Sequence, residues 1–198
     1  NISSLSLSWS WKSPTPPSPA WKGTARWDAY NYIRTNKSMR AYDRAFNISS
    51  AGNQLFIASS AESAVIALDT ADGSENWRAF ASAPVRIAPT FASGKVYFGS
   101  DDGAVRCVSA DNGIVLWTYR AHASKKLIPN DGHFISLYPC RTGVLVQEGK
   151  AYAGFGIVPW KASYLSSIDA HSGVELYKTE LNVGNSLGHT LEGALLAT

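Results

Sequence analysis

Short runs in which hydrophobic and polar residues alternate follow one another along most of the chain, with turn-forming residues between them. In the middle of the chain these runs span 85–92, 95–100, 104–109 and 114–120. The residues that separate them are Ser93-Gly94, Asp101-Asp102-Gly103 and Asp111-Asn112-Gly113, which favour tight hairpins. Alternation with period two is typical of strands, and no window keeps a helical period. The pattern predicts an all-β chain built from units of four antiparallel strands.

A short motif that contains a glycine and an aromatic residue occurs three times. The glycines are Gly73, Gly113 and Gly173, and the aromatic residues four positions later are Trp77, Trp117 and Tyr177. The glycines lie 40 and then 60 residues apart. Each falls in a hairpin turn that requires a positive φ, next to Asp, Asn or Ser. We expect the aromatic side chains to pack between neighbouring sheets.

Two further sets of positions recur at nearly the same period. Similar strands begin at Asn53, Gly94 and Gly149, 41 and then 55 residues apart, and Pro84-Val85-Arg86 is matched by Pro139-Cys140-Arg141. Arg44 falls at the corresponding place in the earlier unit. Four antiparallel strands in a repeat of about 40 residues indicate a β-propeller blade. A β-sandwich would not repeat its sequence, and leucine-rich or ankyrin solenoids have shorter periods.

The second unit resembles the repeat of the PQQ-like, or quinoprotein-like, family. The resemblance rests on Gly94-Lys95-Val96-Tyr97-Phe98-Gly99-Ser100, then Asp101-Asp102-Gly103, then Ala110-Asp111 followed by Gly113 and Trp117. Residues 53–77 and 149–177 match with departures, and the resemblance extends from Tyr42 to Glu180. It implies a β-propeller. It does not select a function, because the repeat occurs both in quinoprotein dehydrogenases and in the scaffold lipoprotein of the bacterial outer-membrane assembly machine.

The repeats predict one partial β-propeller, an arc with interruptions. Its parts are the end of a blade at 1–11, a proline-rich insertion at 12–40, blades at 41–80, 82–120 and 137–180, a loop insertion at 121–136 and the start of the next blade at 188–198. The chain thus holds about four blades at most, counting partial ones, and an unclosed arc would expose strand edges. We expect missing blades or a protein partner to complete the ring. The chain is then a fragment of a larger secreted or periplasmic bacterial protein.

Composition and charge narrow the classes of function. The net charge is +3 and the basic residues are scattered, with Lys125-Lys126 as the one adjacent pair, so no nucleic-acid partner is predicted. No apolar run is long enough to cross a membrane as a helix. Cys107 and Cys140 lack the spacing of a zinc site or a disulfide framework, so we expect both to be small buried or half-buried residues.

The recurring arginines Arg44, Arg86 and Arg141 are the main candidate site. Each is expected to open the first strand of its blade, which in a propeller lines the central channel. Three guanidinium groups near one mouth of that channel would bind an anionic small ligand such as a carboxylate. The alternative is that each arginine pairs with a nearby Asp or backbone carbonyl and ties one blade to the next. His133, in the insertion at 121–136, is a further candidate, because loops on a rigid scaffold often carry function.

The chain does not match the catalytic members of the family. The resemblance implies that those members carry two adjacent cysteines beside the quinone, a Trp stacked below it, and a carboxylate–amide set with a catalytic Asp around Ca²⁺. Here Cys107 and Cys140 are 33 residues apart, and no calcium set can be matched by motif. Turn chemistry alone accounts for residues such as Asp101 and Asp102. We therefore predict no cofactor and no metal, with PQQ and calcium only under the alternative function.

Three functions are compatible with these features. The first is a non-catalytic binding or scaffold module that works through its face loops. The second is part of a PQQ-dependent quinoprotein oxidoreductase, supported by the repeat and by the arginine mouth. The third is an enzyme of another kind that uses the propeller funnel, with His133 and Arg141 as its residues. The lack of a recognisable catalytic constellation favours the first.

Overall fold

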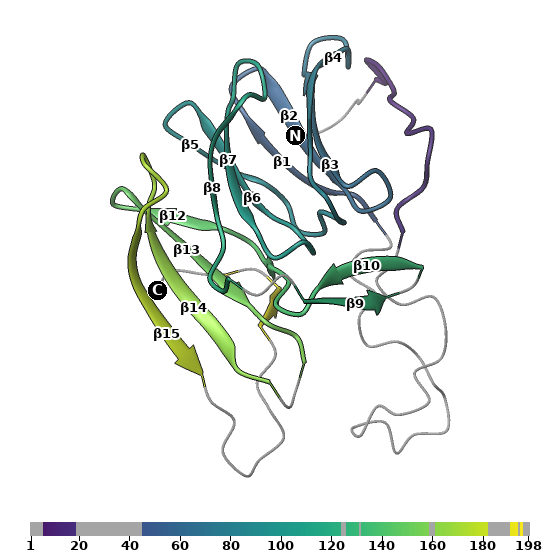
Figure 1. Ribbon diagram of the computed structural model, residues 1–198. Helices are drawn as coiled ribbons and strands as arrows, with labels where there is room; N and C mark the ends of the chain where they lie inside the picture. The colour runs from purple at the N-terminus through teal and green to yellow at the C-terminus, as the bar shows by residue number, and fades with distance from the viewer. Residues whose placement is uncertain are drawn as a thin grey trace.

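The strands of the computed structural model form three four-stranded antiparallel sheets in which consecutive strands pair (Figure 1). The structure describes residues 6–18, 45–123, 126–130, 132–158, 161–181, 191–193 and 195, and these ranges contain no helix. The first blade consists of β1 (Asn47–Ala51), β2 (Gln54–Ser59), β3 (Ala64–Asp69) and β4 (Glu75–Phe80). The second consists of β5 (Thr90–Ala92), β6 (Lys95–Gly99), β7 (Val105–Ser109) and β8 (Val115–Tyr119). The third consists of β12 (Leu145–Gln147), β13 (Lys150–Phe155), β14 (Ser163–Asp169) and β15 (Glu175–Leu181).

Two strand pairs lie outside the blades. Strands β9 (Leu127–Asn130) and β10 (His133–Ser136) form an antiparallel hairpin, so the segment expected to be a loop insertion contains regular structure. Strand β11 (Arg141–Thr142) pairs in parallel with β16 (Glu192–Gly193). The first strand of the second blade is shorter than the expected span 85–92. Pro89, which precedes it directly, has no N–H to donate to a strand ladder.

The turn between the third and fourth strands has the same geometry in every blade. Gly73, Gly113 and Gly173 have φ values of +76°, +70° and +78°. Each glycine N–H donates to the carbonyl oxygen four residues earlier at 2.9 Å. The strand register then shifts at the same point of all three blades, as in a β-bulge. Because a bulge bends its strand, it re-aims the side chains that follow, including the recurring aromatic residue.

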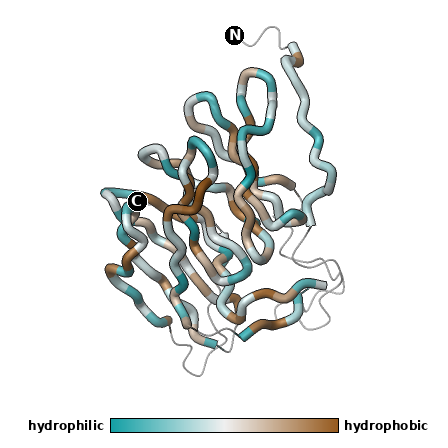
Figure 2. The backbone as a smooth tube through the Cα atoms, turned by 45° about the horizontal axis from the view of Figure 1, so that its top comes forward, coloured by the Kyte–Doolittle hydropathy of each residue, from teal (hydrophilic) through white to brown (hydrophobic). Residues whose placement is uncertain are grey.

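Adjacent blades pack face to face, which makes the chain an arc of a β-propeller. One hydrophobic cluster joins the first two blades and includes Phe56, Trp77 and Phe98. A second joins the second and third blades and includes Tyr97, Trp117 and Phe155. Figure 2 shows the hydrophobic segments along the strands and the more hydrophilic ones at the turns. The alternation seen in the sequence therefore places apolar side chains in the interfaces between blades.

The recurring tryptophans close these interfaces, as predicted. Trp77 and Trp117 are 7% and 8% exposed. The Trp77 indole Nε1 donates to Ala110 O at 2.7 Å in the second blade, and Trp117 Nε1 donates to Ala170 O at 3.2 Å in the third. A Cβ placed on Gly113 or Gly173 would lie only 2.6 or 2.7 Å from the tryptophan ring of the preceding blade. These turns therefore need glycine both for the positive φ and for the close approach of the indole.

The two ends of the arc differ from the expectation. Residues 6–11 form no strand, yet Trp9 lies on Gly73 of the first blade and donates to Thr70 O at 2.8 Å, as the other tryptophans do one blade later. Tyr177 was expected to pack between blades, and that prediction is wrong for the part of the chain that the structure describes. Its side chain is 67% exposed, because no described segment lies in front of it.

Candidate functional site

The structure places two of the three recurring arginines in one buried cluster, while Arg44 lies outside the described residues. Arg86 precedes β5 instead of opening it, and Arg141 lies in β11, which pairs with β16 and not with a blade sheet. Both side chains are almost fully buried, with exposures of 5% and 1%. The expectation that they open the first strands of their blades is therefore wrong.

Asp101 holds the two arginines together. Its carboxylate is fully buried. It accepts hydrogen bonds from Arg86 Nε at 2.7 Å, from Arg141 Nε at 2.8 Å and from Arg141 Nη2 at 3.0 Å. Arg141 Nη2 also donates to Asn130 Oδ1 of the hairpin at 3.0 Å, and Arg86 Nη1 donates to Ser18 O at 3.0 Å. The charges are opposite and the hydrogen bonds are close to ideal, so this geometry offsets the cost of burying the ions.

Glu192 extends this cluster across the next boundary. Arg141 Nη1 lies 3.7 Å from Glu192 Oε1. Because β16 pairs with β11, Glu192 stands directly beside Arg141 in the following segment. The charges thus alternate along Arg86, Asp101, Arg141 and Glu192, and we call these four residues the charge ladder. The ladder links successive units of the arc.

A second buried carboxylate lies beside the ladder. Both carboxylate oxygens of Asp102 accept hydrogen bonds from Arg106. Asp102 also accepts hydrogen bonds from Ser100 Oγ and, at 3.0 Å, from the backbone N–H of Ala104. Burial raises the pKa of Asp102. The hydrogen bond and the positive charge of Arg106, together with Ser100 and Arg120, lower it by more than burial raises it, so the pKa lies below its usual value. The Asp102 carboxylate is therefore an ionised, fully engaged structural group and not a free acid or base.

Sequence reasoning gave pairing with a nearby Asp or backbone carbonyl as one alternative, and the structure confirms it for Arg86 and Arg141, but it did not identify the partner residues. It assigned Asp101 to turn chemistry, and it gave no role to Asn130 or Glu192. The two adjacent acids in Asp101-Asp102-Gly103 were a signal for a further role of one of them. A turn of this kind needs one Asp, and Asp102 fills that role by accepting the backbone N–H of Ala104. Glu192 could have been found because, in the segment after the third blade, it occupies the position that Arg86 and Arg141 hold in the earlier units.

The two cysteines are buried and free, as expected. Burial raises the pKa of Cys107 to about 11 and that of Cys140 to about 12. Since the thiolate is the reactive form, neither thiol is an active nucleophile near neutral pH.

The described residues do not fit a quinone with calcium. The arginines that would hold the quinone carboxylates are buried against Asp101. No three His, Cys, Asp or Glu side chains in the described ranges come together as metal ligands.

His133 begins β10 and is exposed, on a hairpin with a distinctive outer face. In the hairpin register, Phe134 is opposite Pro129, and Leu127 is opposite Ser136. The Leu127 and Phe134 side chains are 58% and 69% exposed. Ile128 and Ile135 point to the other side and pack against residues such as Ala83 and Ile157. The hairpin is thus anchored by one face and presents apolar side chains on the other.

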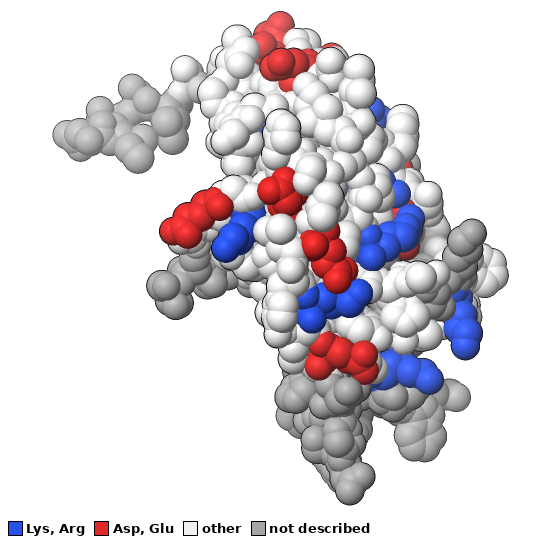
Figure 3. All heavy atoms as spheres, turned by 60° about the vertical axis from the view of Figure 1, so that its left-hand side comes forward, with Lys and Arg blue, Asp and Glu red and all other residues white. Residues whose placement is uncertain are grey.

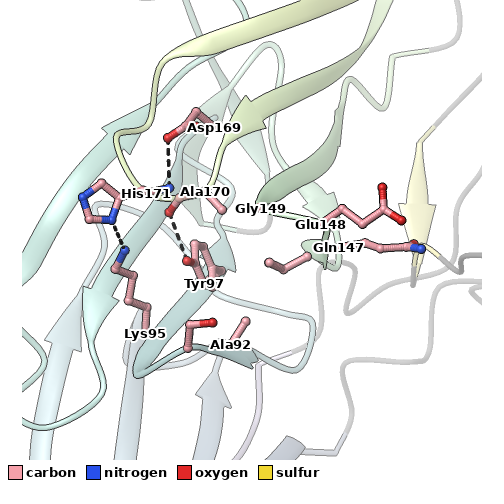
Figure 4. A pocket seen from close by; sticks show the side chains of 11 residues that line it. Ala92, Lys95, Tyr97, Gln147, Glu148, Gly149, Asp169, Ala170 and His171 are labelled. Atoms are coloured by element: carbon pink, nitrogen blue, oxygen red, sulfur yellow. Dashed lines mark hydrogen bonds between the residues drawn. The ribbon is translucent and has the colours of Figure 1, made fainter.

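A crevice opens between the second and third blades, near the turns that precede β6 and β13 (Figure 4). Lys95 Nζ donates to His171 Nδ1 at 2.9 Å, and Tyr97 Oη donates to Ala170 O at 3.0 Å. Glu148 and Asp169 add acidic groups to the same lining.

Figure 3 shows acidic and basic side chains interspersed on the side of the molecule that carries β14 and β15, without a patch of one sign.

The fold and its repeats define a quinoprotein-like β-propeller. The chain belongs to the PQQ-like repeat family whose model, described as "Outer membrane protein assembly factor BamB", matches residues 20–182. A search of curated protein sequences finds no match. The described residues include no helix long and apolar enough to cross a membrane.

Solved structures share the fold at low sequence identity. BamB from Moraxella catarrhalis has a TM-score of 0.50 and 14% identity over 68% of this chain and 35% of its own. The quinohemoprotein alcohol dehydrogenase from Comamonas testosteroni has a TM-score of 0.58 and 20% identity over 68% of this chain and 20% of its own. The computationally designed Ika4 protein has a TM-score of 0.55 and 16% identity, with 78% and 80% coverage. The chain therefore spans about a third of the BamB structure and a fifth of the dehydrogenase.

Proposed function

We propose that this chain is a non-catalytic binding or scaffold module of a larger secreted or periplasmic bacterial protein, with a role in outer-membrane protein assembly. The observation that carries the proposal is the pairing of Arg86 and Arg141 with Asp101. These arginines link blades, and their buried guanidinium groups are bonded to the Asp101 carboxylate. The family description supports a role in assembly.

The β9–β10 hairpin is the surface that we assign to the protein partner. It is fixed to the arc through Ile128, Ile135 and the Asn130 contact with Arg141, so its position is well defined. Its outward Leu127 and Phe134 side chains supply the apolar contact that protein interfaces bury at their centres. The partner would be a protein of the outer-membrane assembly machinery.

A titration with PQQ distinguishes this function from an oxidoreductase. The natively purified protein is titrated with PQQ, with and without Ca²⁺, while heat and absorbance are followed. We expect no saturable binding. Saturable binding that is weakened in folded Arg86→Ala and Arg141→Ala variants, and unchanged in His133→Ala, would contradict the proposal and justify a dehydrogenase screen.

Co-purification tests the proposed partner. A tagged chain is produced in the periplasm of a bacterium with an outer membrane, and bound proteins are identified by mass spectrometry. We expect proteins of the outer-membrane assembly complex, and their loss in the double variant Leu127→Asp, Phe134→Asp. The matched control is Ile114→Asp, because Ile114 is 62% exposed but lies on the β7–β8 turn. Equal recovery from the hairpin variant and the control would exclude the hairpin as the contact.

A further inference from the structure

The two interfaces between blades are built alike, but one position near the strand turns is filled differently. Phe91 and Val146 are the second residues of β5 and β12, the first strands of their blades. The Phe91 ring stacks on Phe56 of the first blade, with the ring centroids 6.1 Å apart and the planes inclined by 10°. Val146 has a smaller side chain than Phe91, so it fills less of the corresponding space between the second and third blades.

The crevice of Figure 4 lies at this place in the second interface. Its volume is about 470 Å³, within the range of about 300–1,000 Å³ for sites that hold small groups. Tyr97, which corresponds to Phe56 in the repeat, is buried at its base, and the Tyr97 hydroxyl donates to Ala170 O at 3.0 Å. Ala92 and Val146 add apolar walls. The crevice therefore corresponds to the space that an aromatic ring fills in the first interface.

The second interface also carries a cation here that the first one lacks. Lys95 begins β6, whereas Gln54 begins β2. His171 lies in the β14–β15 turn, where the β7–β8 turn has Asp111. Lys95 Nζ donates to His171 Nδ1 at 2.9 Å, and this hydrogen bond holds the ammonium group at the edge of the crevice (Figure 4). An ammonium group fixed at such a site attracts the face of an aromatic ring.

We propose that this crevice binds an aromatic side chain, such as that of phenylalanine, from a protein partner. The ring would lie beside Val146 and take the place that Phe91 takes in the first interface. The lining combines Lys95 with Glu148 and Asp169, so its charges are mixed and an uncharged ring suits it better than an ion. The site is separate from the β9–β10 hairpin, and it rests on the proposed function only in that the occupant belongs to a protein partner.

The probe for this site is N-acetyl-phenylalaninamide, which carries the side chain between two amide groups as a polypeptide does. It is titrated into the full chain while chemical shifts are followed by NMR. We expect saturable binding in the millimolar range, because a ligand of this size gains little binding free energy. Intermolecular NOEs should connect its ring protons with the methyl groups of Val146 and Ala92. N-acetyl-leucinamide should bind about threefold more weakly, because it has no ring to face the ammonium group.

Val146→Phe tests whether the empty space is what binds the probe. It fills the crevice with the residue type found in the first interface, so it should abolish probe binding and leave the urea midpoint unchanged or higher. The matched control is Val115→Phe, because Val115 is 48% exposed and lies outside the crevice lining. The control variant should bind the probe as the wild-type chain does.

The NOEs of the wild-type chain decide the outcome even if Val146→Phe does not fold. The proposal is wrong if the wild-type chain shows no saturable binding, if its NOEs lead to Leu127 and Phe134 of the hairpin instead, or if folded Val146→Phe binds the probe as well as the wild-type chain. The proposed function is tested by other residues and by co-purification, so either result can fail while the other stands.

Discussion

The two faces of the third blade carry the same repeat but lie in opposite environments. The inner face presents Ala151, Ala153 and Phe155, all fully buried, to the second blade, and its turn receives Trp117. The outer face presents Tyr177, which holds the position of Trp117 in the repeat but is 67% exposed. The repeat therefore determines the direction of a side chain, whereas its burial depends on whether a neighbouring blade is present.

The largest expected difference between the two faces comes from their aromatic residues. Trp117→Ala should lower the free energy of unfolding by about 3–5 kcal/mol, because it leaves a cavity and removes a buried hydrogen bond. Tyr177→Ala should change it by no more than about 0.5 kcal/mol, as for an ordinary surface substitution. Urea unfolding of the two variants gives both values. Similar losses would show that the outer face is covered in solution.

The charge ladder should also be costly to break. Asp101→Asn leaves two buried guanidinium groups without their shared counter-charge, so we expect a loss of about 3 kcal/mol in unfolding free energy. Glu75→Gln is the control, because the Glu75–Arg78 pair is partly exposed and should contribute less than about 1 kcal/mol. Urea unfolding at neutral pH measures both. A loss at Asp101 as small as that at Glu75 would mean that the ladder contributes little to the arc.

Local sequence rules predicted much more of the interfaces than of the ladder. The glycine turns and the burial of Trp77 and Trp117 follow from spacing within one repeat. Pairing of the arginines with a nearby Asp was one of the two expectations, but the choice of Asp101 as the partner shared by Arg86 and Arg141 was not predicted, because it depends on how successive blades are placed in space. The exposure of Tyr177 was not predicted for a related reason: the position in the repeat sets where the side chain points, but not whether a neighbouring blade covers it.

Two glycines of the second blade separate backbone strain from contact between blades. Gly94 and Gly113 have φ values of +72° and +70°, but a Cβ on Gly94 meets no atom within 4 Å, whereas one on Gly113 lies 2.6 Å from Trp77. Gly94→Ala should cost about 1 kcal/mol from the left-handed backbone. Gly113→Ala should cost about 1–2 kcal/mol more, because the indole must move. Thermal and urea unfolding test the difference, and equal costs would mean that the interface is loosely packed.

The smallest effect is a dependence on pH. The pKa of Asp102 is lowered in the folded state, so its contribution to stability is present above the unfolded value of about 3.9 and is lost as the pH falls through the folded pKa. The wild-type chain should lose stability on acidification below about pH 5 more steeply than Asp102→Asn, which is less stable at neutral pH. Urea unfolding from pH 7 downwards provides the comparison. Parallel curves would contradict the role of the Asp102 charge.

Hydrogen exchange at the tryptophan indoles measures directly whether these residues join the blades. Trp77 and Trp117 close the interfaces by donating Nε1–H to Ala110 O and Ala170 O. In an NMR exchange experiment, these two indole protons should exchange only through unfolding of the arc, and the proton of the half-buried Trp9 indole, whose hydrogen bond to Thr70 O is exposed, should exchange faster. If Trp77 and Trp117 exchange as fast as a free indole, the blades are not joined in this way.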